Sequence, residues 1–285
     1  MAGKTLIEWT DATVNFWWGC TQIGPGCDIC YAKAWDKRTG GSHFGHGVER
    51  RKIKGAVKLL HKLDNDYAWF AADAAAVGDP RYRRRVFIQS MSDLFDNEVP
   101  DEWLAEAWHH ITTCNRLDIQ IVTKRVSVVE KRLKAIGHTL WPRHAGLIIT
   151  VCNQDEANRD IPRLLDLKAR LGIPWVGLSI EPMLGPIDVD ALHTGKIGLY
   201  PLSGVRSDGS GPSGFSQGAR LDWVICGGES GPGARPMQIE WARDLRDQCA
   251  AADTPFFMKQ MGGPRKPFAP IPDDLMIRQF PKVHS

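Results

Sequence analysis

Short apolar segments rich in β-branched residues alternate along the chain with segments in which apolar residues recur at helical spacing. The apolar segments are nearly continuous, as expected for strands buried on both faces of a sheet. They predict strands at residues 12–18, 85–89, 118–123, 146–151, 174–180, 222–226 and 255–258. Because helical patterns separate them, we expect parallel strands joined by right-handed βαβ crossovers.

Three of the intervening segments carry clear helix signals. One helix is expected to begin near Pro100, with two acidic residues in the first turn, where they favour the helix dipole. Another is predicted from the capping-box spacing of Ser127 and Glu130, with Gly137 at its end. A third, over residues 241–249, repeats apolar residues along one face.

The number of strand–helix units favours a partial (β/α)6-7 barrel over an open doubly wound sheet. We expect residues 1–285 to form one such domain.

Two segments depart from the alternation of strands and helices. Residues 41–85 form a basic insertion that includes the cluster at 81–85, and residues 193–220 are rich in Gly and Ser. The second segment predicts a long mobile loop or lid.

Composition narrows the class of protein. The chain has 285 residues, of which 43% are hydrophobic and 24% charged, and its net charge of +3 is too small to indicate nucleic-acid binding by itself. No apolar run approaches the ~20 residues that a membrane helix needs, and residues 1–11 lack the apolar core of a signal peptide. We therefore expect a cytoplasmic protein with no membrane partner. Its seven cysteines, an odd number, argue against a disulfide framework.

Three of the cysteines, Cys20, Cys27 and Cys30, form a C-x6-C-x2-C motif whose longer spacer contains Gly-Pro-Gly. Such a spacer can fold tightly around a small object. Structural zinc sites and electron-transfer clusters normally take four protein ligands, whereas three thiolates leave one iron of a [4Fe–4S] cluster open to a ligand. Two other interpretations remain open, namely a zinc site completed by His43 or His46, and three reduced core cysteines.

Polar side chains follow the predicted strands, where a parallel barrel gathers its functional groups. They are Ser90, Ser92, Asp93, Lys124, Arg125, Asn153, Gln154, Ser179, Glu181, Glu229, Ser230, Lys259 and Gln260. Helix capping alone can account for several of these residues. It accounts poorly for Lys124, Arg125 and Glu181, because a basic residue opposes a helix N-terminus and Glu is a mediocre cap.

Residues 227–233 form a glycine-rich turn after the sixth strand. Glu229 in this turn is predicted to face substrate or cofactor, and Arg235 can pair with an anion. Cys226, at the strand end, is a candidate hydrogen-atom donor, although a buried structural cysteine is the commoner case. We take Cys226, Glu229 and Lys259 as the candidate catalytic residues.

Several blocks of the sequence resemble a phage- and prophage-associated three-Cys-motif family that is radical-SAM-like and of unknown substrate. The blocks are residues 7–13, 19–21, 25–28, 30–32, 90–95, 123–125, 179–186, 222–232 and 259–263. The resemblance implies a radical SAM-type partial barrel in which Cys20, Cys27 and Cys30 hold a [4Fe–4S] cluster. In that class the open iron binds the amine and carboxylate of S-adenosyl-L-methionine, and an electron from an external donor cleaves it to give a 5′-deoxyadenosyl radical.

If the chain binds S-adenosylmethionine, the strand-end residues are its candidate ligands. We hypothesise that Ser90, Ser92 or Asp93 contacts its amine, Lys124 or Arg125 its carboxylate, and Asn153 its ribose, and we include Glu181 among the cofactor-binding candidates. The C-x6-C-x2-C spacing departs from the common C-x3-C-x2-C. Cys152 stands where the family's fourth-strand block leads us to expect an acid.

The leading hypothesis is therefore a radical SAM-type iron–sulfur enzyme that modifies an unidentified substrate, with a nucleic-acid base or nucleotide as the candidate. The resemblance also suggests a separately encoded partner protein. One alternative is a zinc-stabilised nucleic-acid-binding protein without catalysis. Another is a metal-independent barrel hydrolase that uses Glu181 and Glu229 as an acid/base pair.

Overall fold

The computed structural model describes residues 5–80, 82–194, 197–210 and 214–281. The chain divides into two compact units. Unit 1 consists of residues 1–22 and 32–146, and unit 2 of residues 23–31 and 147–285. The expectation of one barrel domain over residues 1–285 stays a prediction.

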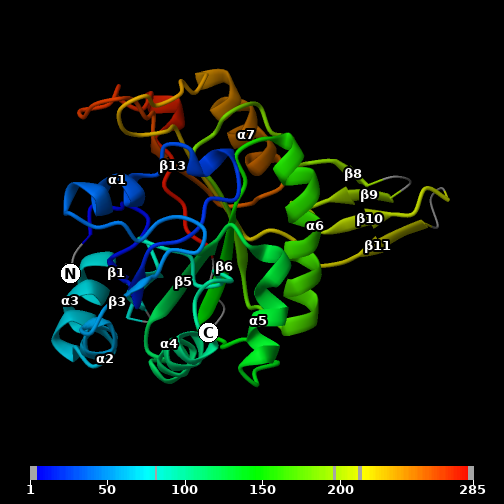
Figure 1. Cartoon of the computed structure of the whole chain (residues 1–285). Coiled ribbons are helices and arrows are strands. Elements are labelled where there is room, and N and C mark those ends of the chain that lie inside the picture. The colour runs from blue at the N-terminus through cyan, green and yellow to red at the C-terminus, as the bar shows by residue number, and fades with distance from the viewer. Residues whose placement is uncertain (1–4, 81, 195–196, 211–213, 282–285) are drawn as a thin grey trace. The chain divides into compact units, whose positions relative to one another are not determined.

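All seven predicted strand regions form strands of one sheet, whose elements are labelled in Figure 1. These strands are β1 (Ala12–Val14), β4 (Arg85–Ile88), β5 (Asp118–Thr123), β6 (Ala145–Thr150), β7 (Val176–Ile180), β12 (Trp223–Gly227) and β13 (Phe256–Gln260). Their order is β1-β4-β5-β6-β7-β12-β13. The pairs β1–β4, β4–β5, β6–β7, β7–β12 and β12–β13 are parallel, which confirms the parallel α/β class.

The first predicted strand is shorter than expected. Asn15 accepts a hydrogen bond from Met91 N (2.7 Å), and Phe16 N donates to the Gln89 side chain (2.7 Å). These bonds replace the ladder of the parallel sheet, so the chain leaves it after Val14. Strand β2 (Trp17–Trp18) instead pairs antiparallel with β3 (Arg51–Lys52).

The helices of unit 1 are α1 (Tyr31–Arg38, which starts in unit 2), α2 (Ala56–Asp64), α3 (Tyr67–Val77), α4 (Asp101–Thr113) and α5 (Val129–Ala135). Helix α4 follows Pro100 as predicted and buries Leu104, Ala107, Trp108 and Ile111. The predicted capping box of α5 is wrong, because Ser127 lies inside a 3-10 turn, η2 (Val126–Val128), and Glu130 pairs with Lys134 (2.8 Å). Gly137 does follow the helix in a left-handed conformation.

The basic insertion contributes α2, α3 and β3 to unit 1, and most of its described arginines have partners inside the unit. Arg84 pairs with Asp73 (Nε–Oδ2 3.0 Å) and Arg85 with Asp11 (2.9 Å). Lys52 pairs with Glu106. Arg81 lies outside the described residues. These ion pairs neutralise part of the positive charge of the segment within unit 1.

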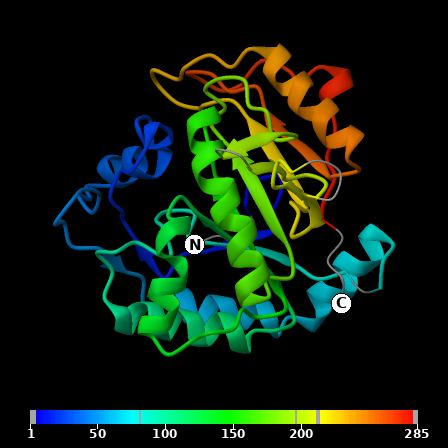
Figure 2. The ribbon, with the colours of Figure 1, turned by 90° about the vertical axis from the view of Figure 1, so that its right-hand side faces the viewer.

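Unit 2 contains the short 3-10 turn η1 (Pro25–Cys27), helices α6 (Gln154–Leu171) and α7 (Ile239–Ala251), and the 3-10 turn η4 (Asp273–Leu275). Figure 2 shows α7 beside the C-terminal segment that carries η4, and Arg243 and Arg246 of α7 both pair with Asp274 (2.9 Å each). Trp223 lies at the centre of the unit's aromatic core, with ring centroids of Trp175, Phe257 and Phe280 within 6.2 Å.

Residues 193–220 contain strands where the sequence predicts a loop. Strands β8 (Leu192–Thr194), β9 (Ile197–Tyr200), β10 (Val205–Ser207) and β11 (Phe215–Gln217) form an antiparallel sheet in the order β11-β10-β9-β8, which projects past α6 in Figure 1. Strands this short hold too few residues for an alternating pattern to stand out among the glycines and serines. Residues 195–196 and 211–213 of the predicted loop lie outside the described residues.

Across the part of the chain that the structure describes, no helix has both the length and the apolar character required to cross a membrane.

Replacing Trp223 with alanine is expected to destabilise the protein by about 3–5 kcal/mol, because the substitution leaves a large cavity and removes the hydrogen bond from Nε1 to Gln279 O (2.9 Å). Urea unfolding measures the change. Leu140→Ala, at a side chain that is 76% exposed, is the control and should change stability by less than about 0.5 kcal/mol. Equal losses in the two variants would contradict the placement of Trp223 in the core.

Candidate functional site

The seven cysteines fall into two groups. Cys20, Cys27 and Cys30 are partly exposed, whereas Cys114, Cys152, Cys226 and Cys249 are buried. Burial raises the pKa of both Cys114 and Cys249 to about 12, and it also raises the pKa of Cys226. The three cysteines of the motif are therefore the accessible thiols of the described chain, and these buried ones remain protonated.

Cys20 belongs to unit 1, where backbone contacts hold the segment on both sides of it. Gly19 N donates to Met91 O (3.2 Å) and Gly45 N donates to Cys20 O (3.1 Å). Gly19 has a φ of +98°, and a Cβ at this position would lie 2.0 Å from the carbonyl oxygen of His43. Only glycine fits this close approach.

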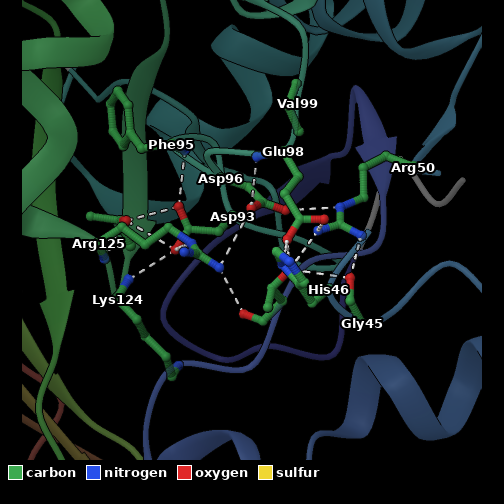
Figure 3. A network of polar contacts seen from close by, with 12 residues as sticks. Gly45, His46, Arg50, Asp93, Phe95, Asp96, Glu98, Val99, Lys124 and Arg125 are labelled. Carbon is green, nitrogen blue, oxygen red and sulfur yellow. Dashed lines mark hydrogen bonds and ion pairs between the residues drawn. The ribbon is translucent and has the colours of Figure 1, made fainter. Parts of the chain in front are cut away.

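Thr21, the next residue, is held by three charged side chains. Arg50 Nη2 donates to its hydroxyl oxygen (2.7 Å), the hydroxyl donates to Glu98 Oε1 (2.8 Å), and Arg125 Nη2 donates to its carbonyl oxygen (2.7 Å). Both the side chain and the backbone of Thr21 are thus fixed. Figure 3 shows the network that these arginines and carboxylates form.

Arg50 and Asp96 form the buried centre of this network. Each side chain is 1% exposed, and Arg50 Nε lies 2.9 Å from Asp96 Oδ2. Arg50 Nη1 also donates to the carbonyl oxygens of Gly45 (2.9 Å) and Val48 (2.6 Å). Arg125 Nη2 lies 3.5 Å from the other oxygen of Asp96. Asp96 therefore links the two arginines that contact Thr21.

Glu98 closes the network on its exposed side. Its carboxylate accepts hydrogen bonds from Thr21, from Gly47 N (2.7 Å) and from His46 Nδ1 (2.8 Å), and it lies 3.2 Å from Arg50. Burial opposes ionisation of this group, but these hydrogen bonds and the charge of Arg50 outweigh it and lower the pKa of Glu98 to about 2. Glu98 is therefore an anion throughout the physiological range.

Asp93, in the loop that follows β4, lies against the end of β5 in the same network. It accepts hydrogen bonds from the Thr123 hydroxyl (2.8 Å), Lys124 N (3.0 Å) and Phe95 N (2.9 Å). Burial raises its pKa, although the charge of Arg125 and these hydrogen bonds oppose the shift. Because Thr123 and Lys124 both donate to it, the Asp93 carboxylate holds the turn after β5 in place.

The other residues predicted at this end of unit 1 are also engaged by their own chain. The Ser90 hydroxyl accepts from Asn15 Nδ2 (3.0 Å), and the Ser92 hydroxyl donates to Trp17 O (3.1 Å). The Lys124 side chain points away from the carboxylates in Figure 3. Asp93, Lys124 and Arg125 are brought together as predicted, while the roles assigned to them in cofactor binding stay predictions.

Cys27 and Cys30 belong to unit 2, where Arg235 joins their segment to the glycine-rich turn after β12. Arg235 binds Glu229 through Nε (2.8 Å), Nη2 (2.6 Å) and its backbone N (2.9 Å). It also donates to Pro25 O (2.8 Å) and to Asp28 (3.0 Å). Burial opposes ionisation of Glu229, yet the hydrogen bonds from Arg235 lower its pKa.

Asn153 caps helix α6. Its side chain accepts from Glu156 N (2.9 Å), and Glu156 Oε2 accepts in return from Cys152 N (2.8 Å). The other oxygen, Glu156 Oε1, would lie 2.6 Å from a Cβ at Gly24, in the cysteine segment. A carboxylate therefore stands beside this segment although Cys152 replaces the expected acid. The spacing of Asn153 and Glu156 could have indicated it.

Glu181 and Lys259 form an ion pair at the ends of β7 and β13. Lys259 Nζ lies 2.5 Å from Glu181 Oε1, and both side chains are mostly buried. Strand β12 lies between these two strands, and its Gly227 leaves the space that Glu181 enters, since a Cβ there would be 3.0 Å from Glu181 Oε1. The neighbouring Cys226 is fully buried, with its Sγ 3.6 Å from Met183 Sδ.

Among the described residues, no group of three or more His, Cys, Asp or Glu side chains is arranged to hold a metal ion within the structure. The thiols of the motif lie in both units, with Cys20 in unit 1 and the other two in unit 2. As donors they suit a thiolate-bound metal centre, because they are reduced and partly exposed.

One comparison identifies a family. Residues 4–275 match the model of a family described as a protein of unknown function, DUF5131. The chain belongs to the DUF5131 family. No curated protein and no solved structure matched the chain. Membership in DUF5131 covers both units and both cysteine segments, but it assigns them no activity.

Replacing Arg50 with methionine is expected to cost about 3–5 kcal/mol of stability, because the buried Asp96 would lose its 2.9 Å ion pair and keep only the longer contact with Arg125 (3.5 Å). Urea unfolding measures this loss. The control is Lys134→Met, which breaks an exposed pair in the same unit and should cost less than about 1 kcal/mol. A loss of that small size for Arg50→Met would show that the network contributes little.

The low pKa of Glu98 predicts a pH-dependent contribution to stability. Its pKa rises from about 2 in the folded state to about 4.5 on unfolding, so its stabilising effect is complete above pH 4.5 and is lost as the pH falls toward 2. The difference in unfolding free energy between wild type and Glu98→Gln should therefore be smaller near pH 3 than near pH 7. Urea unfolding across this range tests it, and a constant difference would contradict the assignment.

Proposed function

We propose that this DUF5131 protein is an iron–sulfur enzyme of the radical SAM type. The observation that carries the proposal is the contrast among the cysteines. The partly exposed thiols belong to the C-x6-C-x2-C motif, and the others are buried. The parallel α/β sheet supports the proposal because it is compatible with a radical SAM-type barrel. The resemblance of the sequence blocks to the three-Cys-motif family suggests the radical SAM type of chemistry.

Cys20, Cys27 and Cys30 would hold the [4Fe–4S] cluster, which, when bound, supplies one-electron reductive cleavage of S-adenosylmethionine. The chain's own groups prepare the ligand segments. Arg50 and Arg125 fix Thr21 after the first cysteine, and Arg235 fixes the carbonyl of Pro25 before the second.

Polar groups at the strand ends would bind the organic ligands. Glu181 and Lys259 present opposite charges at one edge of unit 2, where they can receive the charged groups of a ligand. Glu229 is already held by Arg235, which suits a supporting position. The external electron donor, a partner protein and a nucleic-acid base or nucleotide as substrate remain part of this proposal on sequence grounds alone.

One observation favours a second candidate, a zinc-stabilised protein. His43 Nδ1 lies 2.8 Å from Asp36 Oδ1, and His46 Nδ1 lies 2.8 Å from Glu98 Oε1. A carboxylate at one ring nitrogen is the usual arrangement around a metal-binding histidine, because it directs the other nitrogen toward the metal. The hydrolase alternative gains no such support, since Glu181 and Glu229 are each held in an ion pair with a different cation, Lys259 and Arg235.

Anaerobic reconstitution with iron and sulfide distinguishes these functions. We expect a brown protein with about four iron and four sulfide per chain, which forms 5′-deoxyadenosine from S-adenosylmethionine under reducing conditions. Cys27→Ala should lose both properties, and Cys249→Ala, at a buried cysteine of α7, should keep them. A colourless protein with one bound zinc and no 5′-deoxyadenosine would replace the proposed function with the zinc alternative.

A further inference from the structure

The Arg235 guanidinium in unit 2 contacts residues on both sides of Cys27, the second cysteine of the motif. Its guanidinium donates to the carbonyl oxygen of Pro25 and to the carboxylate of Asp28, the residues two before and one after Cys27. These two residues belong to or adjoin the 3-10 turn η1, in which Cys27 N donates to Gly24 O (2.9 Å) and Asp28 N donates to Pro25 O (3.3 Å).

Glu229 determines where this guanidinium points. The carboxylate is buried, and it accepts two side-chain bonds from Arg235 in addition to the backbone bond. A guanidinium is a rigid planar fork, so a bidentate partner fixes its plane and the directions of its remaining donors. Glu229 thus sets the direction of the hydrogen bond that Arg235 donates to Pro25 O, and both Glu229 and Arg235 are far from Pro25 in the sequence.

The rest of the segment is supported by small contacts. A Cβ at Gly233 would lie 3.6 Å from the Ile29 Cδ1 methyl, and a Cβ at Gly231 would lie 3.9 Å from its Cγ2 methyl. Both glycines have positive φ, a backbone conformation that residues with a side chain rarely adopt, so the turn requires glycine at these positions. The carboxylate of Glu156 stands against Gly24 at the other end of the segment.

We propose that Arg235, oriented by Glu229, is a positioning residue that sets the Cys27–Cys30 segment in the conformation needed to ligate the cluster. This inference rests on the proposed function and assigns Glu229 a supporting role instead of a catalytic one. The partners of a metal-ligating segment usually affect metal affinity by about 10-fold to 100-fold. Because the fork geometry carries the effect, a lysine that keeps only the charge does not replace Arg235.

The test compares Arg235→Gln, Arg235→Lys and Glu229→Gln with wild type and with Arg243→Gln. Arg243 forms an exposed ion pair with Asp274 in the same unit and serves as the matched control. Each protein is titrated anaerobically with iron and sulfide, and bound iron and the electron paramagnetic resonance spectrum of the reduced cluster are recorded. Amide hydrogen exchange over residues 23–31 is measured before reconstitution.

The Arg235 variants are expected to need about 10-fold more iron for half-loading, to give a changed or broadened spectrum, and to exchange faster over residues 23–31. Glu229→Gln should shift in the same direction, and Arg243→Gln should match wild type. Global misfolding is recognised by faster exchange across α7 as well, and in that case Glu229→Gln, which preserves the shape of the site, decides the outcome.

Two results would overturn the inference. If wild type loads a cluster and Arg235→Gln or Arg235→Lys loads it equally well with the same spectrum, Arg235 has no positioning role and the proposed function stands. If wild type takes up no cluster, the proposed function fails, and the inference fails with it.

Discussion

The buried contact between Arg50 and Asp96 is the constraint on which the arrangement of unit 1 depends. Removing two opposite charges from water costs several kcal/mol for each ion unless the partner and further hydrogen bonds compensate. Further contacts compensate this cost. Arg50 donates to backbone carbonyls of the 45–48 loop, and Asp96 also faces Arg125. As a result, segments far apart in sequence must adopt a single mutual geometry within the unit.

Both units use the same device near a cysteine. In unit 1 the Arg125 guanidinium binds the carbonyl oxygen of Thr21, and in unit 2 the Arg235 guanidinium binds that of Pro25. Asp96, from the loop after β4, lies beside Arg125, and Glu229, from the same loop as Arg235, binds the Arg235 guanidinium. A backbone carbonyl held by a charged donor gives a loop a defined shape without a regular ladder of hydrogen bonds, which suits a segment whose thiols must remain accessible.

Much of the fold follows from the sequence, because strands buried on both faces leave long apolar runs. Strand β5 begins and ends where the pattern predicts, and α4 begins directly after Pro100 as predicted. Local signals failed where side chains replaced backbone partners. Asn15 ends β1 early through a contact with Met91, and the short strands of residues 192–217 carry no detectable alternation.

The candidate site was predictable in its residue types but not in its partners. The motif identified the three cysteines, and their exposure agrees with it. Asp93 and Glu229 are predicted to face a ligand, but the sequence pattern does not reveal that the Thr123 hydroxyl binds Asp93 and that Arg235 binds Glu229. The sequence does not indicate Asp96 and Glu98 for the same reason, because their significance lies in contacts between loops, whereas the spacing of Asn153 and Glu156 does indicate Glu156.

The antiparallel sheet of unit 2 has a consequence for the behaviour of the chain at high concentration. One of its edges is β11, whose three residues are exposed and include Phe215. An open edge invites pairing with the edge of another molecule, but such pairing gains strength with the number of consecutive backbone groups offered. Three residues offer few of them, so the brevity of β11 protects the protein from stacking edge to edge into aggregates.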